Sequence, residues 1–205
     1  MENFDIVIVG GGPSGATFAK FIDKKYKVLL LERRDFNDSS NTHIKCCGGL
    51  LNEKAQAILA ALNYSIPQNI LVDPQVFNIK ILDLDNNLTK RYFKGYLNMD
   101  RELFDSYMLS QASPNVKIIT NAIYHKFSKD SNGGYTVDYR VNGKLSVVKC
   151  QILIGADGAS SRVASEIDPN DENKYIAPSY ILTLGIINGI LTSEIIFIPF
   201  FFALI

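Results

Sequence analysis

The chain has 205 residues, 47% of them hydrophobic, and its 21 Lys and Arg residues balance 21 Asp and Glu residues. That length suffices for one large domain, or for one domain with a smaller lobe, around a hydrophobic core. Zero net charge without a basic block argues against nucleic acid as a partner. The three cysteines form no CxxC pair and the first residues are not a signal peptide, so we expect a cytosolic protein.

The first element along the chain is an apolar strand that runs into three glycines. Residues 4–9 are almost uncharged and rich in β-branched side chains, which predicts a central parallel strand. Gly10 permits the tight turn out of this strand, and Gly12 lets a diphosphate approach the backbone without meeting a Cβ. Gly15 lets the following helix pack closely on the sheet.

The helix after the turn and a second strand complete a dinucleotide-binding pattern. Pro13 and Ser14 suit the first helical turn, whose free N–H groups and dipole favour a diphosphate. Residues 27–31 predict the second strand, and Glu32 at its end can accept hydrogen bonds from both hydroxyls of an adenosine ribose. Glu32 would also repel a 2′-phosphate, which disfavours NADP at this site.

A loop with the sequence IKCCGGLL follows a polar stretch. Gly48 and Gly49 permit close backbone approach to a planar ligand, and Cys47 would then lie beside that ligand. Alternatively, the two cysteines are small buried hydrophobes that flank a glycine turn, and the residues leave both interpretations open. We expect no metal site, because His43 is the only nearby histidine and there is no second thiol pair.

The central part of the chain predicts two helices. Asn52 can cap a helix that extends to residue 62. Asp100 can cap a second helix that has Arg101 in its first turn. A cation in that position opposes the helix dipole, so Arg101 is either solvated or reaches an anion held elsewhere.

Extended segments surround these two helices. An antiparallel hairpin is expected between residues 66 and 93, with its turn at residues 85–87. Alternating patterns and turn residues predict a short strand at 116–120, a meander at 122–127, 135–141 and 145–148, and then a separate strand that starts at residue 151.

That last strand ends in a second glycine-rich turn, at residues 155–158, which contains Asp157 and leads to a helix start at Ser160 or Ser161. Asp157 could be only a turn residue. The turn would also lie beyond the carboxyl end of a strand, where ligands of open α/β sheets bind. Asp157 is therefore a candidate for the same site as the first glycine turn.

Four motifs in this order resemble the FAD-dependent oxidoreductases of the geranylgeranyl reductase type, which share a fold with the aromatic hydroxylases. They are GGGPSGAT with Glu32 and Arg33, then CCGGLL, then DRELFD, then GADGASSRV, and the resemblance covers about residues 4–166. The resemblance implies an α/β fold, in which a Rossmann-like FAD-binding domain with a parallel sheet is interrupted by a smaller antiparallel β lobe.

The same resemblance assigns expected bounds to the parts of the chain. The FAD-binding domain is expected to be discontinuous, over residues 1–65, 96–128 and 150–175. The hairpins of the smaller lobe and the meander would take residues 66–95 and 129–149, and an apolar tail would take residues 176–205.

FAD, rather than NAD, is the tightly held cofactor that the resemblance implies, with NAD(P)H as a transient electron donor. Glu32 would hold the adenosine ribose and Arg33 the adenine side. Arg101 would reach FAD from its helix, and Asp157 would contact the cofactor near the diphosphate. The residues implied at the diphosphate are Gly10, Gly12, Pro13, Ser14 and Gly15, and those implied near the flavin ring are Cys47, Gly48 and Gly49.

The end of the chain departs from this resemblance. The family carries a later Gly-Asp motif and a larger substrate domain, and no Gly-Asp pair occurs here, so we expect the C-terminal part to be missing. Residues 181–205 hold Glu194 as their only formal charge and are long enough to span a bilayer. Three interpretations stay open: a membrane anchor, a buried core segment, or an apolar tail left by truncation or a reading-frame change.

The resemblance implies that complete relatives reduce carbon–carbon double bonds of isoprenoid-like apolar substrates. Cys47 is the candidate catalytic residue near the reacting atoms. Two alternatives remain open: an FAD-dependent monooxygenase acting on a small aromatic substrate, and a truncated fragment without catalytic activity.

Overall fold

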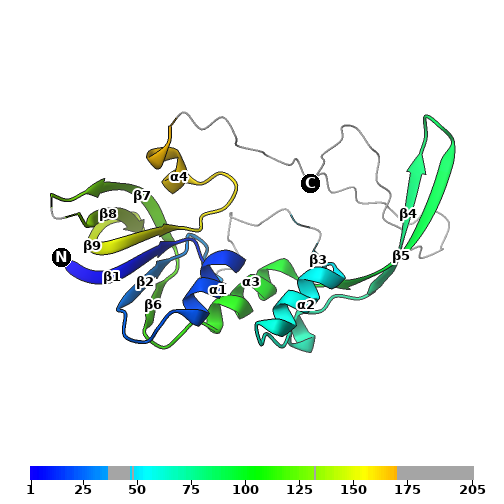
Figure 1. Cartoon of the computed structure of the whole chain (residues 1–205), viewed down its shortest axis with the longest axis horizontal. Coiled ribbons are helices and arrows are strands. Elements are labelled where there is room, and N and C mark those ends of the chain that lie inside the picture. Colours follow the sequence, from blue (N-terminus) through cyan, green and yellow to red (C-terminus); the bar gives the residue numbers. More distant parts are fainter. Residues whose placement is uncertain (37–46, 48, 132, 170–205) are drawn as a thin grey trace. The chain divides into compact units, whose positions relative to one another are not determined.

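The computed structural model describes residues 1–36, 47, 49–131 and 133–169 of the chain (Figure 1). These residues form two compact units. The first unit contains residues 1–36 and the described residues from 105 to 169, and the second contains residue 47 and residues 49–104.

A six-stranded sheet forms the centre of the first unit, with the strand order β6-β2-β1-β9-β8-β7. The four strands β6, β2, β1 and β9 pair in parallel, whereas β9, β8 and β7 pair antiparallel. The strands are β1 (Glu2–Val9), β2 (Val28–Leu31), β6 (Val116–Ile119), β7 (Ala122–Lys129), β8 (Tyr135–Val141) and β9 (Lys144–Gly155). The predicted parallel sheet is therefore present, and the predicted meander extends it on one side.

The strands β1 and β2 lie in the middle of this sheet and are buried on both faces. Residues 6–9 of β1 and 28–31 of β2 are all apolar, and none of them is more than 4% exposed. A continuous apolar run of this kind is what a parallel strand needs when both of its faces are covered. The prediction of a central strand at residues 4–9 is thus confirmed.

Strand β9 corrects one sequence expectation. We expected a meander strand at 145–148 and a separate strand from residue 151, but Lys144–Gly155 is one continuous strand. It pairs with β8 over its first half and with β1 from Val148 to Gly155. The buried Val148 and Cys150 flank Lys149, so the alternation of a strand continues through the residues where we placed a break.

Three helices contribute to the first unit. Helix α1 (Pro13–Phe21) follows β1, and α4 (Arg162–Ile167) follows β9. Helix α3 (Arg101–Ser110) contributes its residues from Asp105 onward. A hydrogen bond of 2.9 Å from Ser113 N to Ala19 O ties the segment after α3 to α1.

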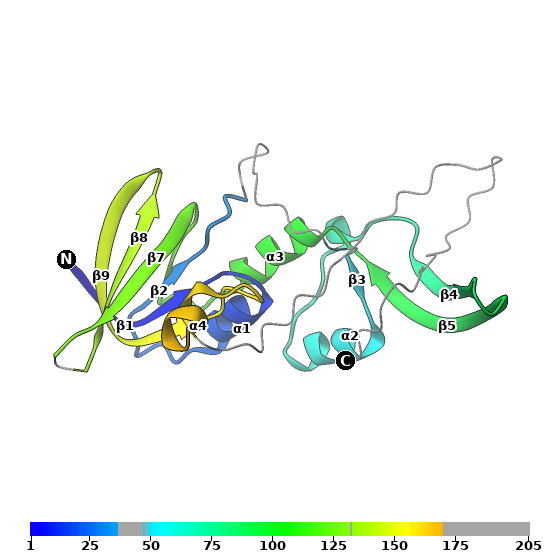
Figure 2. The ribbon, with the colours of Figure 1, turned by 90° about the horizontal axis from the view of Figure 1, so that it is seen from above.

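The second unit is built on a three-stranded antiparallel sheet with the order β3-β5-β4. Its elements are β3 (Leu50–Leu51), α2 (Glu53–Ala61), the short 3₁₀ helix η1 (Gln68–Ile70), β4 (Val76–Asp83) and β5 (Leu88–Asn98). Figure 2 shows β4 and β5 as a long curved hairpin. Asp83 accepts hydrogen bonds from the backbone and side-chain nitrogens of Asn86, which confirms the predicted turn.

The apolar tail predicted at residues 176–205 lies outside the described residues. Across the part of the chain that is described, no helix combines the length and the apolar character needed to cross a bilayer.

Candidate functional site

The glycine-rich turn after β1 is closed so tightly that two of its glycines leave no room for a side chain. Gly10 has φ +103°, and a Cβ on it would lie 2.4 Å from Ala156 O at the end of β9. A Cβ on Gly15 would lie 1.9 Å from Gly10 O. Both contacts are far inside van der Waals distance, so the turn, the start of α1 and the end of β9 can only pack this closely around glycine.

The N-terminus of α1 carries no side-chain cap. Gly12 is the N-cap residue and makes no side-chain cap hydrogen bond, and Pro13 follows it. Gly12 O accepts the first intrahelical hydrogen bond, from Ala16 N, at 2.9 Å. The first N–H groups of any helix lack intrahelical acceptors and carry partial positive charge, so they can bind an anion such as a diphosphate. Gly12 offers no Cβ to block that approach.

Glu32 lies directly after β2, and its carboxylate is buried beside the glycine turn. The residue is only 4% exposed. Its Oε2 accepts a hydrogen bond of 2.7 Å from Gly11 N, and its Oε1 accepts one of 2.9 Å from Arg34 N. A Cβ on Gly11 would lie 3.0 Å from Glu32 Oε2, so the absence of a side chain at position 11 leaves space for the carboxylate.

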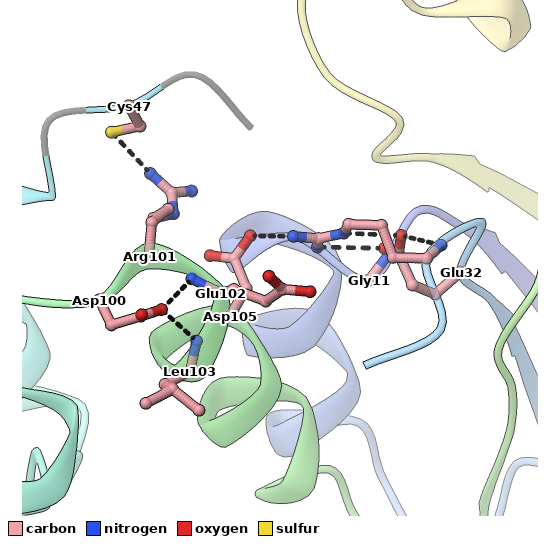
Figure 3. Close-up of polar contacts among 9 residues, drawn as sticks. Gly11, Glu32, Cys47, Asp100, Arg101, Glu102, Leu103 and Asp105 are labelled. Carbon is pink, nitrogen blue, oxygen red and sulfur yellow. Dashed lines mark hydrogen bonds and ion pairs between the residues drawn. The ribbon is translucent and has the colours of Figure 1, made fainter. Parts of the chain in front are cut away.

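The Arg34 guanidinium joins two buried carboxylates, those of Glu32 and Asp105, which are labelled in Figure 3. Its Nε donates to Glu32 Oε1 at 3.0 Å and its Nη2 to Glu32 Oε2 at 3.4 Å. Its Nη1 donates to Asp105 Oδ2 of helix α3 at 2.8 Å. The Arg34 Cζ also lies 4.6 Å from the centre of the Phe36 ring. Arg34 is therefore held on three sides.

These contacts set the protonation state of Glu32. Burial raises the pKa of the Glu32 carboxyl, but hydrogen bonds from the side chain and backbone of Arg34, with the Arg34 charge, outweigh burial and hold that pKa below its ordinary value. Glu32 is therefore a carboxylate at neutral pH, acceptor only, as recognition of hydroxyl groups requires.

Arg34 is the residue that the sequence analysis missed. The resemblance points to Arg33 for the adenine side, and Arg33 is exposed, whereas Arg34 is 3% exposed. One signal was available, because side chains two residues apart in extended backbone point to the same face. That spacing places Arg34, and not Arg33, on the side of Glu32.

Arg101 and Cys47 contact each other in the second unit. Arg101 Nη1 lies 3.5 Å from Cys47 Sγ, and Cys47 is exposed. The predicted Asp100 cap is confirmed, because Asp100 Oδ1 accepts hydrogen bonds from Glu102 N at 2.8 Å and Leu103 N at 2.9 Å (Figure 3). The Asp100 carboxylate offsets the unfavourable position of Arg101 at the positive end of the helix dipole.

Gly49 follows Cys47 closely and fixes the backbone of this segment. Its φ is +66°, and a Cβ on it would lie 2.0 Å from Met99 O. Met99 N in turn donates to Gly49 O at 2.9 Å. Gly48, the other glycine predicted here, lies outside the described residues.

Asp157 holds the start of helix α4. Its Oδ2 accepts hydrogen bonds from Arg162 N at 2.7 Å and Val163 N at 3.3 Å, and its Oδ1 accepts one from the Ser161 hydroxyl. Ser161 is itself the N-cap of α4, as predicted. The Asp157 side chain thus stabilises the start of helix α4. The Asp157 backbone packs against the first glycine turn, because a Cβ on Gly10 would lie 2.9 Å from Asp157 Cα.

The predicted site residues divide between the two units. The first unit brings together the glycine turn, Glu32 and the backbone of Asp157, and the second brings together Arg101, Cys47 and Gly49. Among the described residues, no cluster of three or more His, Cys, Asp or Glu residues could hold a metal ion.

Comparison with known proteins agrees with this geometry. Residues 8–37 match the model of an NAD(P)-binding Rossmann-like domain. Protein CbrA of Shigella sonnei is 30% identical over 178 residues, which are 86% of this chain and 50% of CbrA. The chain thus spans about half the length of the curated relatives it matches.

Two solved structures show the same fold. A geranylgeranyl bacteriochlorophyll reductase-like protein of Thermoplasma acidophilum superposes with a TM-score of 0.66 and 21% identity, over 86% of this chain and 44% of that protein. The flavin-dependent monooxygenase PieE, solved in complex with FAD and substrate, has a TM-score of 0.56 and 19% identity, over 80% of this chain and 32% of PieE. The chain therefore has the Rossmann-like α/β fold of FAD-dependent oxidoreductases.

Proposed function

We propose that the first unit binds FAD and that the chain is the FAD-binding part of a flavin-dependent oxidoreductase. The observation that carries this proposal is the buried Glu32 carboxylate beside the uncapped N-terminus of α1. The N-terminus of α1 is suited to bind the diphosphate, and the Glu32 carboxylate is suited to bind the adenosine ribose. Gly10, Gly12 and Gly15, with Pro13 and Ser14, would form the diphosphate cradle.

Glu32 would accept a ribose hydroxyl mainly at Oε2. Its Oε1 already accepts two short hydrogen bonds, from Arg34 N at 2.9 Å and Arg34 Nε at 3.0 Å. Its Oε2 accepts one short bond, from Gly11 N, and one long contact of 3.4 Å, from Arg34 Nη2. A carboxylate oxygen can accept two hydrogen bonds, so a hydroxyl at Oε2 would replace the long contact.

The charges around Glu32 favour FAD over a dinucleotide with a 2′-phosphate. Glu32 is a buried carboxylate, and the Arg34 guanidinium beside it is already paired with both Glu32 and Asp105. A phosphate close to this carboxylate would be repelled in a poorly screened environment. The ribose hydroxyls of FAD carry no charge and meet no such repulsion.

FAD, when bound, would supply two-electron oxidation and reduction at its ring. For the protein, the task is then to orient the cofactor and to place the substrate. We propose that Arg33 lies at the adenine side, that Arg101 reaches the cofactor, and that Cys47 with Gly48 and Gly49 lies near the ring. The Arg101–Cys47 contact supports a shared role for those two side chains. Asp157 would act near the diphosphate through the turn whose backbone meets Gly10.

For the complete relatives we propose reduction of carbon–carbon double bonds in isoprenoid-like apolar substrates. The similarity to a geranylgeranyl bacteriochlorophyll reductase-like protein supports this. A monooxygenase of small aromatic substrates, with NAD(P)H as transient electron donor, is the second candidate, and the similarity to PieE supports it. Anaerobic reduction of an alkene favours the reductase, whereas oxygen-dependent hydroxylation coupled to NAD(P)H oxidation favours the monooxygenase.

The decisive experiment is a flavin titration of the 205-residue chain. We expect a yellow purified protein, or quenching of flavin fluorescence that saturates at about one equivalent of added FAD. FMN lacks the adenosine half and is the matched control, which we expect to bind at least tenfold more weakly. A colourless protein that binds no added FAD, or one that binds FMN and FAD equally, would contradict the proposal and favour the interpretation of a fragment without cofactor.

A further inference from the structure

Glu32, Arg34 and Asp105 form a chain of three buried charged side chains at the end of β2. Their exposed fractions are 4%, 3% and 0%. Two ion pairs join them, Arg34 Nε to Glu32 Oε1 at 3.0 Å and Arg34 Nη1 to Asp105 Oδ2 at 2.8 Å. The two ends of this chain come from segments 73 residues apart, a strand end and helix α3.

The need to fill space in the core does not explain why three charged side chains are buried together here. Removing charges from water costs free energy, and apolar side chains of similar volume often stabilise a fold as well or better. What the three side chains provide instead is a fixed orientation for one of them. Glu32 is the member next to the glycine turn, and at its Oε2 the long contact from Arg34 Nη2, at 3.4 Å, is the one that a hydroxyl group can replace.

The shape of Arg34 makes it suited to fix Glu32. Before a ligand binds, its planar guanidinium contacts both Glu32 oxygens, through Nε at 3.0 Å and Nη2 at 3.4 Å, and so sets the plane of the carboxylate. When a hydroxyl replaces the long Nη2 contact, the Nε bond to Oε1 still holds the carboxylate. Asp105 holds the remaining nitrogen, Nη1, and the Phe36 ring lies 4.6 Å from Cζ. Arg34 therefore cannot turn away from Glu32 without breaking its bond to Asp105.

We propose that Arg34, held in place by Asp105, is a positioning residue that orients the Glu32 carboxylate towards the hydroxyl groups of the adenosine ribose. This inference rests on the proposed FAD site. It adds a specificity role to two residues that do not themselves touch the cofactor, since Glu32 stands between them and the ribose. An acceptor held in the correct orientation before binding loses less freedom when the hydroxyl arrives.

The test compares FAD with an FAD analogue whose adenosine ribose lacks both hydroxyls. The measured quantity is the ratio of the two dissociation constants, analogue over FAD, from quenching of flavin fluorescence. Because a hydrogen bond to a charged acceptor contributes strongly, we expect a ratio of about 10 to 100 for the native chain. Glu32→Gln, which removes the charged acceptor, should bring the ratio below about 3 and so establishes that the ratio reports on Glu32.

Arg34→Lys and Asp105→Asn are the variants that test the positioning role. Lysine keeps the charge but cannot meet both carboxylate oxygens in one plane, so we expect a ratio below about 3. Asparagine keeps the shape of Asp105 and weakens its hold on Arg34, so we expect an intermediate ratio. A purely structural role would weaken both ligands equally and leave the ratio unchanged. Folded variants with the native ratio would therefore overturn the inference.

Two further variants, Glu2→Gln and Phe36→Leu, help to distinguish a failure of the proposed FAD site from a failure of the proposed positioning role. Glu2→Gln removes the exposed ion pairs of Glu2 with Lys27 and Lys117 and should keep the native ratio. A native chain that binds neither ligand contradicts the FAD site itself, and one that binds both equally contradicts the role of Glu32 and with it this inference. If Arg34→Lys and Asp105→Asn yield no folded protein, Phe36→Leu removes the ring beside Arg34 without changing a charge. It should lower the ratio at least about twofold, and an unchanged ratio would overturn the inference.

Discussion

The carbonyl oxygen of Gly10 lies where a side chain on Gly15 would have to be, at 1.9 Å from an ideal Cβ on Gly15. The two glycines therefore depend on each other: the turn out of β1 brings the Gly10 carbonyl over the first turn of α1, and only glycine at position 15 accepts it. This pair joins the strand, the turn and the helix N-terminus into one rigid cradle.

Gly15→Ala should therefore destabilise the first unit strongly. The carbonyl and the helix would have to move apart by more than an ångström, and we expect a loss of about 3 kcal/mol or more in the free energy of unfolding. Urea unfolding followed by circular dichroism measures it. Gly95→Ala is the matched control, since a Cβ there meets only Glu53 Oε1 at 3.6 Å. A Gly15→Ala chain as stable as the Gly95→Ala chain would show that the turn is less tightly packed than described.

Much of this fold was predictable from local pattern. The strands expected at residues 4–9 and 27–31 are present as Glu2–Val9 and Val28–Leu31, and the expected caps Asn52, Asp100 and Ser161 are present too. Local rules suffice there because each depends on residues close in sequence. The break expected between residues 148 and 151 was wrong, because the pairing of β9 with both β1 and β8 is a long-range property.

The candidate site was predictable only in part, for a similar reason. Glu32 follows from its place after a strand, and the glycines from their spacing. The role of Arg34 depends on Asp105, which lies 71 residues further along the chain, and no local pattern pairs them. Likewise, the bonds from Asp157 to Arg162 and Val163 appear only once the turn is folded.

Glu32 should make stability depend on pH in the acid range. Its pKa in the folded chain is below the ordinary value of 4.5. Its contribution is therefore fully present above about pH 4.5 and is lost as the pH falls through the folded pKa. Over that window the Glu32→Gln chain should lose stability less steeply than the native chain, by up to about 1.4 kcal/mol per pH unit. Equal slopes, from unfolding free energies measured between pH 2.5 and pH 7, would contradict an ion pair at Glu32.

Asp157→Asn should test the hold of Asp157 on helix α4. The amide keeps one acceptor but loses charge-assisted bonds to the backbone nitrogens of Arg162 and Val163, so we expect a loss of about 1 to 2 kcal/mol in stability. Ser161→Ala removes the neighbouring N-cap bond to Ala164 N and should cost about 1 kcal/mol. If the Asn variant is as stable as the native chain but binds FAD more weakly, the Asp157 side chain serves the cofactor rather than the helix.

The two described cysteines should differ sharply towards an alkylating reagent. Cys150 is 3% exposed in β9, and burial raises the pKa of its thiol to about 11, whereas Cys47 is exposed. Because the thiolate is the reacting form, iodoacetamide at pH 8 should modify Cys47 in the folded chain and leave Cys150 intact until the chain unfolds. Tandem mass spectrometry in a Cys46→Ser background measures each site.

The same labelling experiment tests the proposed place of Cys47 near the flavin ring. Saturating FAD should slow the alkylation of Cys47 at least severalfold, because a ring beside the thiol would cover it, while Cys150 stays protected with or without FAD. Replacing Cys47 with Ala or Ser should alter turnover in the complete enzyme and leave its FAD content intact. Alkylation of Cys47 at the same rate with and without bound FAD would remove it from the vicinity of the ring.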